Sequence, residues 1–196
     1  MTEAAGTAGP RPQLSSALRQ TQRQIDALSD DDLSRSTPCA DYDAGTLVAH
    51  IIAVLRKLEA VGRGEKASEV ADPATDITGG SGEAFRQAWT DFERVWSTDA
   101  ALDEQYTMPW ATMSGRELLD AYTHEFTVHS WDLVHVTGNV SDLDPVLGQA
   151  ALDWFVSNVP ADSRSHDGPF APVVEVDAGS DVYTRLAGYV GRPVRG

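Results

Sequence analysis

Apolar residues recur at helical spacing in four long stretches of this sequence, and this periodicity constrains the fold more than any other feature. The longest stretch opens with the capping-box sequence Ser114-Gly115-Arg116-Glu117 and ends near Gly138. The others cover residues 14–28, 47–61 and 85–96, and shorter stretches cover 145–155 and 182–189. Convincing strand patterns are scarce. The sequence therefore predicts an all-α fold, a helical bundle with up-down-up-down topology as the default.

The segments between these stretches are rich in glycine and proline. Asp43 is the predicted N-cap of the helix that contains residues 47–61. Residues 62–82 are predicted to form a long polar connection, and connections of that length often border a functional site. Residues 161–179 are expected to be loop-like, with an extended run at 173–176. We expect a bundle with extra short helices and long irregular connections.

Length and composition indicate one domain. The chain has 196 residues, of which 1–12 are expected to form a flexible leader and 13–196 a single helical domain. Thirty Asp and Glu against fifteen Lys and Arg give a net charge of −15, which disfavours nucleic acids and anionic membranes as partners. No apolar run is long enough to span a bilayer. With Cys39 as the single cysteine, we expect a reducing, cytoplasmic location and a packing role for its thiol.

Two ionisable residues fall on the apolar face of the longest stretch. On a helical wheel, Glu125 and His129 lie about 20° to either side of the middle of that face. His124 and His135 fall about 100° to 120° away, outside the arc that is expected to face the core. His50 lies at the edge of the apolar face of the stretch 47–61, from which it can reach the same interior.

These three residues allow two interpretations. Two imidazoles and a carboxylate from facing helices form a ligand set that suits Zn(II), Ni(II) or Fe(II), with Asp132 placed to orient the imidazole of His129. Alternatively, Glu125 and His129 form a hydrogen-bonded pair in the core, and His50 is a half-exposed helix residue. The pattern alone leaves both open.

Several short motifs carry a resemblance to a known family. They are Thr37-Pro38-Cys39, Leu47-Val48-Ala49-His50, the run Glu125-Phe126-Thr127-Val128-His129-Ser130-Trp131-Asp132-Leu133, and Thr137-Gly138. With the C-terminal segment 168–192, they resemble actinobacterial metal-binding proteins of the DinB/YfiT-like superfamily, related to the N-terminal domain of mycothiol-dependent maleylpyruvate isomerase. The resemblance implies a four-helix bundle and a divalent ion, zinc first and nickel or iron as alternatives. It assigns His50, Glu125 and His129 as the ligands.

The resemblance also implies a kind of chemistry. Characterised relatives use the ion to activate a small thiol such as mycothiol, as isomerases or thiol S-transferases, so a small-molecule thiol and an electrophile are the expected partners. One alternative is hydrolysis by metal-bound hydroxide, assisted by Asp132. Another is a non-catalytic, metal-stabilised binding module, a homodimer through an exposed aromatic face that includes Trp131.

Other residues and motifs add little. Arg185, on the last predicted helix, is a candidate for binding a substrate carboxylate or a surface cation near a helix end. No residue is assigned a catalytic role. The sequence has no Gly-x-Gly-x-x-Gly, Walker loop, Gly-x-Ser-x-Gly or Cys-x-x-Cys motif that would indicate nucleotide binding, serine hydrolysis or dithiol redox chemistry.

Overall fold

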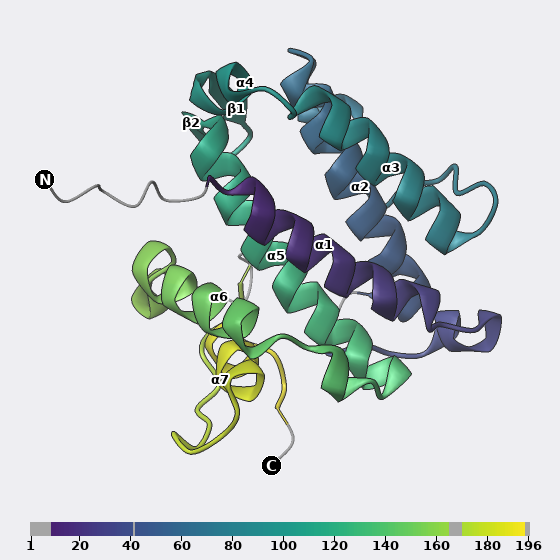
Figure 1. Cartoon of the computed structure of the whole chain (residues 1–196). Coiled ribbons are helices and arrows are strands. Elements are labelled where there is room, and N and C mark those ends of the chain that lie inside the picture. The colour runs from purple at the N-terminus through teal and green to yellow at the C-terminus, as the bar shows by residue number, and fades with distance from the viewer. Residues whose placement is uncertain (1–8, 41, 165–169, 195–196) are drawn as a thin grey trace, which may run out of the picture.

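Four long helices form a bundle, as Figure 1 shows. The structure is a computed structural model, and it describes residues 9–40, 42–164 and 170–194. The bundle helices are α1 (Arg11–Asp26), α2 (Ala44–Gly62), α3 (Ser81–Val95) and α5 (Gly115–Thr137). Three further helices are α4 (Asp99–Asp103), α6 (Pro145–Asn158) and α7 (Val182–Tyr189). The all-α prediction is confirmed, with short 3-10 turns at Asp30–Ser34, Ala67–Glu69, Val140–Asp142 and Ala161–Ser163.

Local capping groups explain where the main helices begin and end. The Asp43 carboxylate accepts a hydrogen bond of 2.8 Å from the backbone N–H of Thr46 and caps α2 as predicted. Ser114 and Glu117 form the predicted capping box at the start of α5. At the other end of α5, Gly138 adopts a left-handed conformation with φ of 76°, which costs a glycine no strain.

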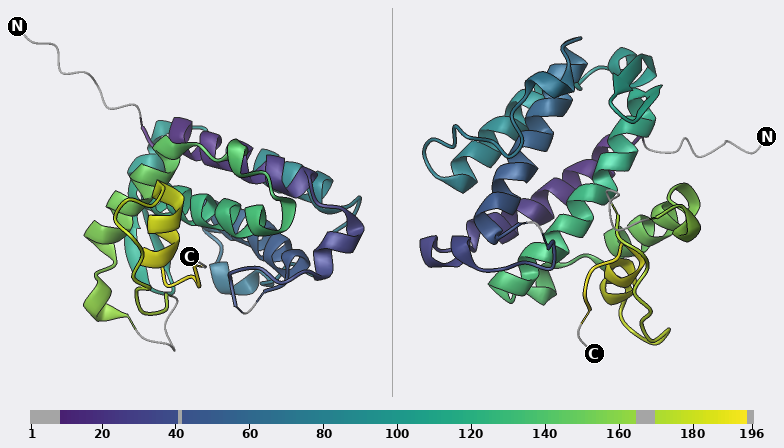
Figure 2. Two further views of the ribbon diagram at one scale, coloured as in Figure 1. Left: turned by 90° about the horizontal axis from the view of Figure 1, so that it is seen from below. Right: turned by 180° about the vertical axis from the view of Figure 1, so that it is seen from behind.

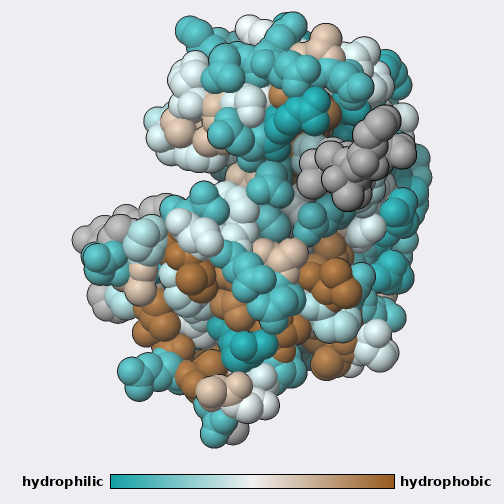
Figure 3. All heavy atoms as spheres, turned by 60° about the vertical axis from the view of Figure 1, so that its left-hand side comes forward, coloured by the Kyte–Doolittle hydropathy of each residue, from teal (hydrophilic) through white to brown (hydrophobic). Residues whose placement is uncertain are grey.

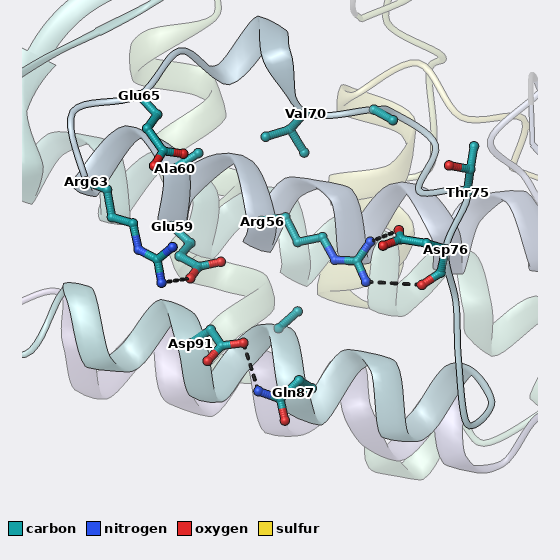
Figure 4. Close-up of a pocket in the computed structure, with 12 residues that line it drawn as sticks. Arg56, Glu59, Ala60, Arg63, Glu65, Val70, Thr75, Asp76, Gln87 and Asp91 are labelled. Carbon is teal, nitrogen blue, oxygen red and sulfur yellow. Dashed lines mark hydrogen bonds and ion pairs between the residues drawn. The ribbon is translucent and has the colours of Figure 1, made fainter.

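The topology differs from the predicted up-down-up-down order. Residues 63–80 run back along α2, so that the Asp72 carboxylate meets Lys57 and the N–H of Ala74 donates to the Ala49 carbonyl. Because the chain returns to the end at which α2 began, α3 starts there and runs parallel to α2 (Figure 4). α1 and α5 form the other parallel pair, antiparallel to the first (Figures 1 and 2). The long connection was expected, but its path decides the topology.

Helix α5 lies at the centre of the molecule. α2 packs on one side of it, while α6 and α7 lie on the other (Figure 2). The helical-wheel placement of His124 outside the core is therefore wrong: its side chain is 3% exposed and its ring lies 5.2 Å from the ring of Trp154 on α6. A wheel identifies one apolar face, whereas a central helix is covered on several faces. His135 is exposed, as predicted.

The C-terminal helices build a second hydrophobic cluster beside the bundle core. Its buried members come from α5, α6, α7 and the residue that follows α7: Val128, Trp131, Ala151, Phe155, Tyr183, Leu186, Ala187 and Val190. The expectation that Trp131 forms an exposed dimer face is therefore wrong, because the ring is buried within its own chain. Apolar side chains also gather on the surface in the part of the molecule that holds α6 and α7 (Figure 3). Two valines of α6, Val146 and Val156, are exposed.

A small antiparallel hairpin lies between α4 and α5. Its strands, β1 (Gln105–Met108) and β2 (Ala111–Ser114), pair Gln105 with Ser114 and were not predicted. The extended run expected at 173–176 is no strand in the described part of the chain, although Val174 donates a backbone hydrogen bond to the Gly188 carbonyl. Helix α1 begins at Arg11, inside the range expected for the leader, and residues 1–8 lie outside the described residues. No helix in the described ranges is long and apolar enough to cross a membrane.

Candidate metal centre

The structure brings together His50, Glu125 and His129, the three side chains selected from the sequence. His50 projects from α2, and the other two lie one turn apart on α5. One potential ligand atom from each residue lies within 4.8 Å of the other two. The His50 Nε2 atom is 3.5 Å from the Glu125 Oε1 atom, and the two imidazole centroids are 5.3 Å apart. These residues form the candidate metal centre.

Each histidine of this centre is oriented by a carboxylate. The Nδ1 atom of His50 is 2.8 Å from Asp72 Oδ1, and the other oxygen of Asp72 accepts from Lys57 Nζ at 2.6 Å. The Nδ1 atom of His129 is 3.0 Å from Asp132 Oδ2, as the sequence predicted for that carboxylate. Because both Nδ1 atoms are engaged, each ring has Nε2 left for an ion, the arrangement typical of carboxylate–histidine–metal sites.

Asp132 is in turn held by an arginine from the end of the chain. Arg192 Nε donates to Asp132 Oδ1 at 2.9 Å, and its Nη2 donates to Oδ2 at 3.0 Å. This bidentate pair is buried, since the Asp132 side chain has no exposed surface. Arg185, which the sequence left as a candidate for a substrate carboxylate or as a surface cation, donates from Nη2 to Gln149 Oε1 of α6 at 3.3 Å. Through Asp132, the segment after α7 is thus linked to the candidate metal centre, a link that the sequence analysis missed.

The electrostatics of the site favour a positive charge between the carboxylates. Burial lowers the pKa of His50, but hydrogen bonds and charge from Glu125 and Asp72 outweigh it, so the pKa lies above its ordinary value. Burial raises the pKa of Asp132, but Arg192 and His129 outweigh it, so this pKa lies below its ordinary value. Glu125 and Asp72 stabilise the protonated form of His50, and a divalent cation bound at this centre would replace that proton.

The donor set fits a divalent ion. Two ligands about 2.1 Å from a tetrahedral ion lie about 3.4 Å apart, and the measured His50–Glu125 separation is 3.5 Å. Two nitrogens and one oxygen suit zinc, nickel or iron, and three protein ligands leave a coordination position for a small molecule. The site is only partly closed: His129 is buried, whereas His50 and Glu125 are half-buried.

A cavity of about 810 Å³ adjoins the candidate metal centre through Glu125, which belongs to both. Its walls come from the hairpin, the first half of α5, the end of α6 and the segment before α7. They include five aromatic side chains: Trp110, Tyr122, Trp154, Phe155 and Phe170. Burial raises the pKa of the Tyr122 phenol and the negative charge of Glu125 adds to this effect, so the phenol remains a hydrogen-bond donor at neutral pH.

A second cavity, of about 510 Å³, lies between α2, α3 and the connection that follows α2 (Figure 4). Its charged side chains engage one another: Arg56 pairs with Asp76, and Arg63 pairs with Glu59 at 2.6 Å. None of the three candidate ligands lines this cavity. The aromatic cavity is therefore the one positioned to hold a molecule against the metal centre.

Cys39 lies in the loop before α2 and is half-buried. The Tyr42 N–H donates to the Cys39 carbonyl at 2.9 Å, and the Tyr42 ring lies 5.2 Å from the imidazole of His50. The loop thus packs an aromatic ring against one candidate ligand. The packing role expected for the Cys39 thiol itself stays a prediction.

Comparison with known proteins identifies the family. The model of the mycothiol maleylpyruvate isomerase N-terminal domain matches residues 14–134, more than half of the chain. The chain belongs to this family. The match contains all three candidate ligands and ends before α6, so α6, α7 and Arg192 lie beyond it.

Two solved structures share the fold. They are the crystal structures of mycothiol-dependent maleylpyruvate isomerase and of a histidine-to-alanine mutant of it, with TM-scores of 0.57 and 0.56 at 14% and 13% identity. Each alignment covers 76% of this chain and 70% of the other chain. The bundle prediction is thereby confirmed. Uncharacterized proteins from two strains of Mycobacterium tuberculosis are 27% identical over 165 residues, which is 84% of this chain and 87% of theirs.

Proposed function

We propose that the protein is a divalent-metal-dependent enzyme that transfers or rearranges groups on a small thiol such as mycothiol. The observation that carries the proposal is the arrangement of His50, Glu125 and His129, with a carboxylate on each histidine Nδ1 atom and a cavity at Glu125. Membership of the maleylpyruvate isomerase N-terminal family supports the thiol as co-substrate. Zinc is the ion we expect, because its preferred ligands are nitrogen, sulfur and carboxylate oxygen.

The residues around the centre have separate tasks in this proposal. A bound divalent ion would supply Lewis acidity, which keeps a thiol deprotonated at neutral pH. Asp72 and Asp132 hold the two imidazoles in the tautomer that presents Nε2. The aromatic cavity holds the electrophile beside Glu125, and the buried Tyr122 phenol is available to donate a hydrogen bond to it.

Metal analysis tests the first half of the proposal. The full chain, purified without chelator, is compared with His50→Ala, Glu125→Gln and His129→Ala. His135→Ala serves as the matched control, because His135 lies on the same helix and is exposed. We expect near-equimolar metal in the unmodified protein and in the control, and a large loss in the three ligand variants. If all three variants retained the metal, His50, Glu125 and His129 would not be its ligands.

Cobalt substitution tests the second half. A thiolate that enters the coordination sphere of cobalt changes its absorption spectrum, so titration with mycothiol or a simpler thiol reports binding without any turnover. We expect a saturable change in the cobalt-loaded protein and none in the His129→Ala variant. If the protein bound cobalt but its spectrum did not respond to thiols, the thiol-dependent function would be contradicted, and only the metal-binding part of the proposal would stand.

A further inference from the structure

The lining of the cavity at Glu125 combines aromatic rings with negative charge. The five aromatic side chains supply its apolar surface, and Trp110, which is 56% exposed, stands where the cavity meets solvent. Three carboxylates also line it: Glu117, Asp120 and Glu125. The described residues that line the cavity include no lysine, arginine or histidine, although the Nε2 atom of the buried His124 lies 3.6 Å from Asp120. A ligand in this cavity therefore meets ring faces and negative potential together.

The carboxylates divide the cavity into two ends. Glu125 belongs to the metal centre, whereas Glu117 lies eight residues earlier on α5, about 12 Å along the helix axis at 1.5 Å per residue. Asp120 lies between them, less than a turn from Glu117. The hydrogen bonds that Ser114 donates to Glu117 hold the pKa of its carboxyl below the ordinary value, so this end of the cavity is anionic at neutral pH.

This charge pattern limits what the cavity can accept. With Glu125 engaged at the metal centre, a molecule that extends away from it places its far end beside Glu117 and Asp120. A carboxylate at that end would be repelled, and no cation among the described lining residues would compensate it. A protonated amine or quaternary ammonium would be attracted by the carboxylates and by the partly exposed indole ring of Trp110.

We propose that the electrophilic substrate is an aromatic molecule without negative charge, with its reactive carbon at the metal centre and a cationic group at the Glu117–Asp120 end of the cavity. This inference rests on the proposed function, because that function places the reactive end of the substrate at the metal centre and therefore its other end beside Glu117 and Asp120. In the simplest reaction, the thiol sulfur attacks a benzylic carbon that carries a leaving group such as a halide. The carbon–sulfur bond forms, the carbon–halide bond breaks, the halide leaves with the bonding electrons, and the thiol proton passes to solvent.

Binding of two unreactive probes of the same shape tests this inference without any turnover. The probes are 2-phenylethylammonium, which is cationic, and phenylacetamide, which is neutral, and NMR titration of the metal-loaded full chain gives the dissociation constant of each. We expect the cation to bind about fivefold more tightly, the scale of one partly exposed charge pair. In the double variant Glu117→Gln, Asp120→Asn this preference should disappear while the neutral probe binds as before. Gln at position 117 preserves the capping box.

A matched control separates the cavity charges from the overall charge of the protein. Asp153 lies exposed on α6 and does not line the cavity, so Asp153→Asn changes the net charge without altering the lining. The preference should survive in this control. The preference for the cationic probe should also survive in His129→Ala. Loss of the metal site in that variant would contradict the proposed thiol chemistry without affecting the charge selectivity of the cavity.

Four results would overturn the inference. The first two are equal affinity for the two probes and no binding of either probe at millimolar concentration. The other two concern the double variant: a preference for the cationic probe that persists there, and loss of binding of both probes together. The last result would mean that Glu117 and Asp120 maintain the cavity rather than select its ligand.

Discussion

Replacing Arg192 by methionine should damage the protein in two measurable ways, because this arginine neutralises a carboxylate that has no exposed surface. Asp132 accepts two hydrogen bonds from Arg192, at 2.9 and 3.0 Å, and one from His129 at 3.0 Å. Removing one partner of a buried ion pair typically costs 3–5 kcal/mol, since the remaining charge is left uncompensated. Because His129 stays in place, we expect the lower end, about 3 kcal/mol.

Urea unfolding at neutral pH measures this cost, and a second arginine provides the control. Arg185→Met removes the same side chain from α7, where the guanidinium contacts the neutral Gln149, and should cost about 1 kcal/mol. The double variant Asp132→Asn, Arg192→Met removes both charges and should recover about 2 kcal/mol relative to Arg192→Met alone.

The second effect is on metal binding. Without Arg192, the Asp132 carboxylate loses two of its three hydrogen bonds, so it fixes the orientation of the His129 imidazole less firmly. Loss of such an outer contact typically weakens metal affinity by about 10- to 100-fold. An Arg192→Met protein that unfolds and binds metal like the unmodified chain would refute the reasoning, and a double variant no more stable than Arg192→Met would refute the charge argument specifically.

Two further predictions concern other carboxylates. Asp72→Asn should weaken zinc binding by about tenfold in a competition titration, because Asp72 orients His50, while Asp76→Asn, in the same connection but paired with Arg56, should not. Asp181 caps α7; burial raises its pKa, but hydrogen bonds from Thr184 and Tyr183 outweigh this and lower it. Asp181→Ala should therefore cost about 1 kcal/mol at neutral pH. This difference should shrink as the pH falls below about 4, since a carboxylate with a lowered pKa stabilises the folded state only while ionised; thermal unfolding from pH 3 to 7 measures it, and a constant difference would contradict the assignment.

The features predicted from the sequence are those encoded by neighbouring residues. Asp43 and the Ser114–Glu117 box are local capping signals, and both cap the helices they were expected to cap. Glu125 and His129 were selected because a helix places residues four apart on one face, which holds wherever the helix packs. His50 required one more assumption, that its helix faces α5, and the family resemblance supported it.

The features that were missed depend on the path of the chain. Asp72 reaches His50 because residues 63–80 run back along α2, and no periodicity in a polar connection encodes that direction. His124 was placed outside the core because α6 packs on a face of α5 that a single-helix wheel leaves to solvent. Arg192 lies 60 residues from Asp132 along the chain, so the contact exists only once α6 and α7 are folded onto α5.

The segment beyond the family match connects the two halves of the proposed site. Trp154 and Phe155 of α6 form one wall of the aromatic cavity, and Arg192, beyond α7, holds the carboxylate that orients His129. Both contacts rest on one hydrophobic cluster, in which Phe155 and Leu186 pack together with Trp131 of α5. The bundle thus supplies the candidate metal ligands, while the segment beyond it supplies one wall of the aromatic cavity and Arg192, which holds one of the two carboxylates that orient the candidate histidine ligands. In family members that share the bundle, differences in this segment would therefore change substrate preference and metal affinity together, without any change in the ligands themselves.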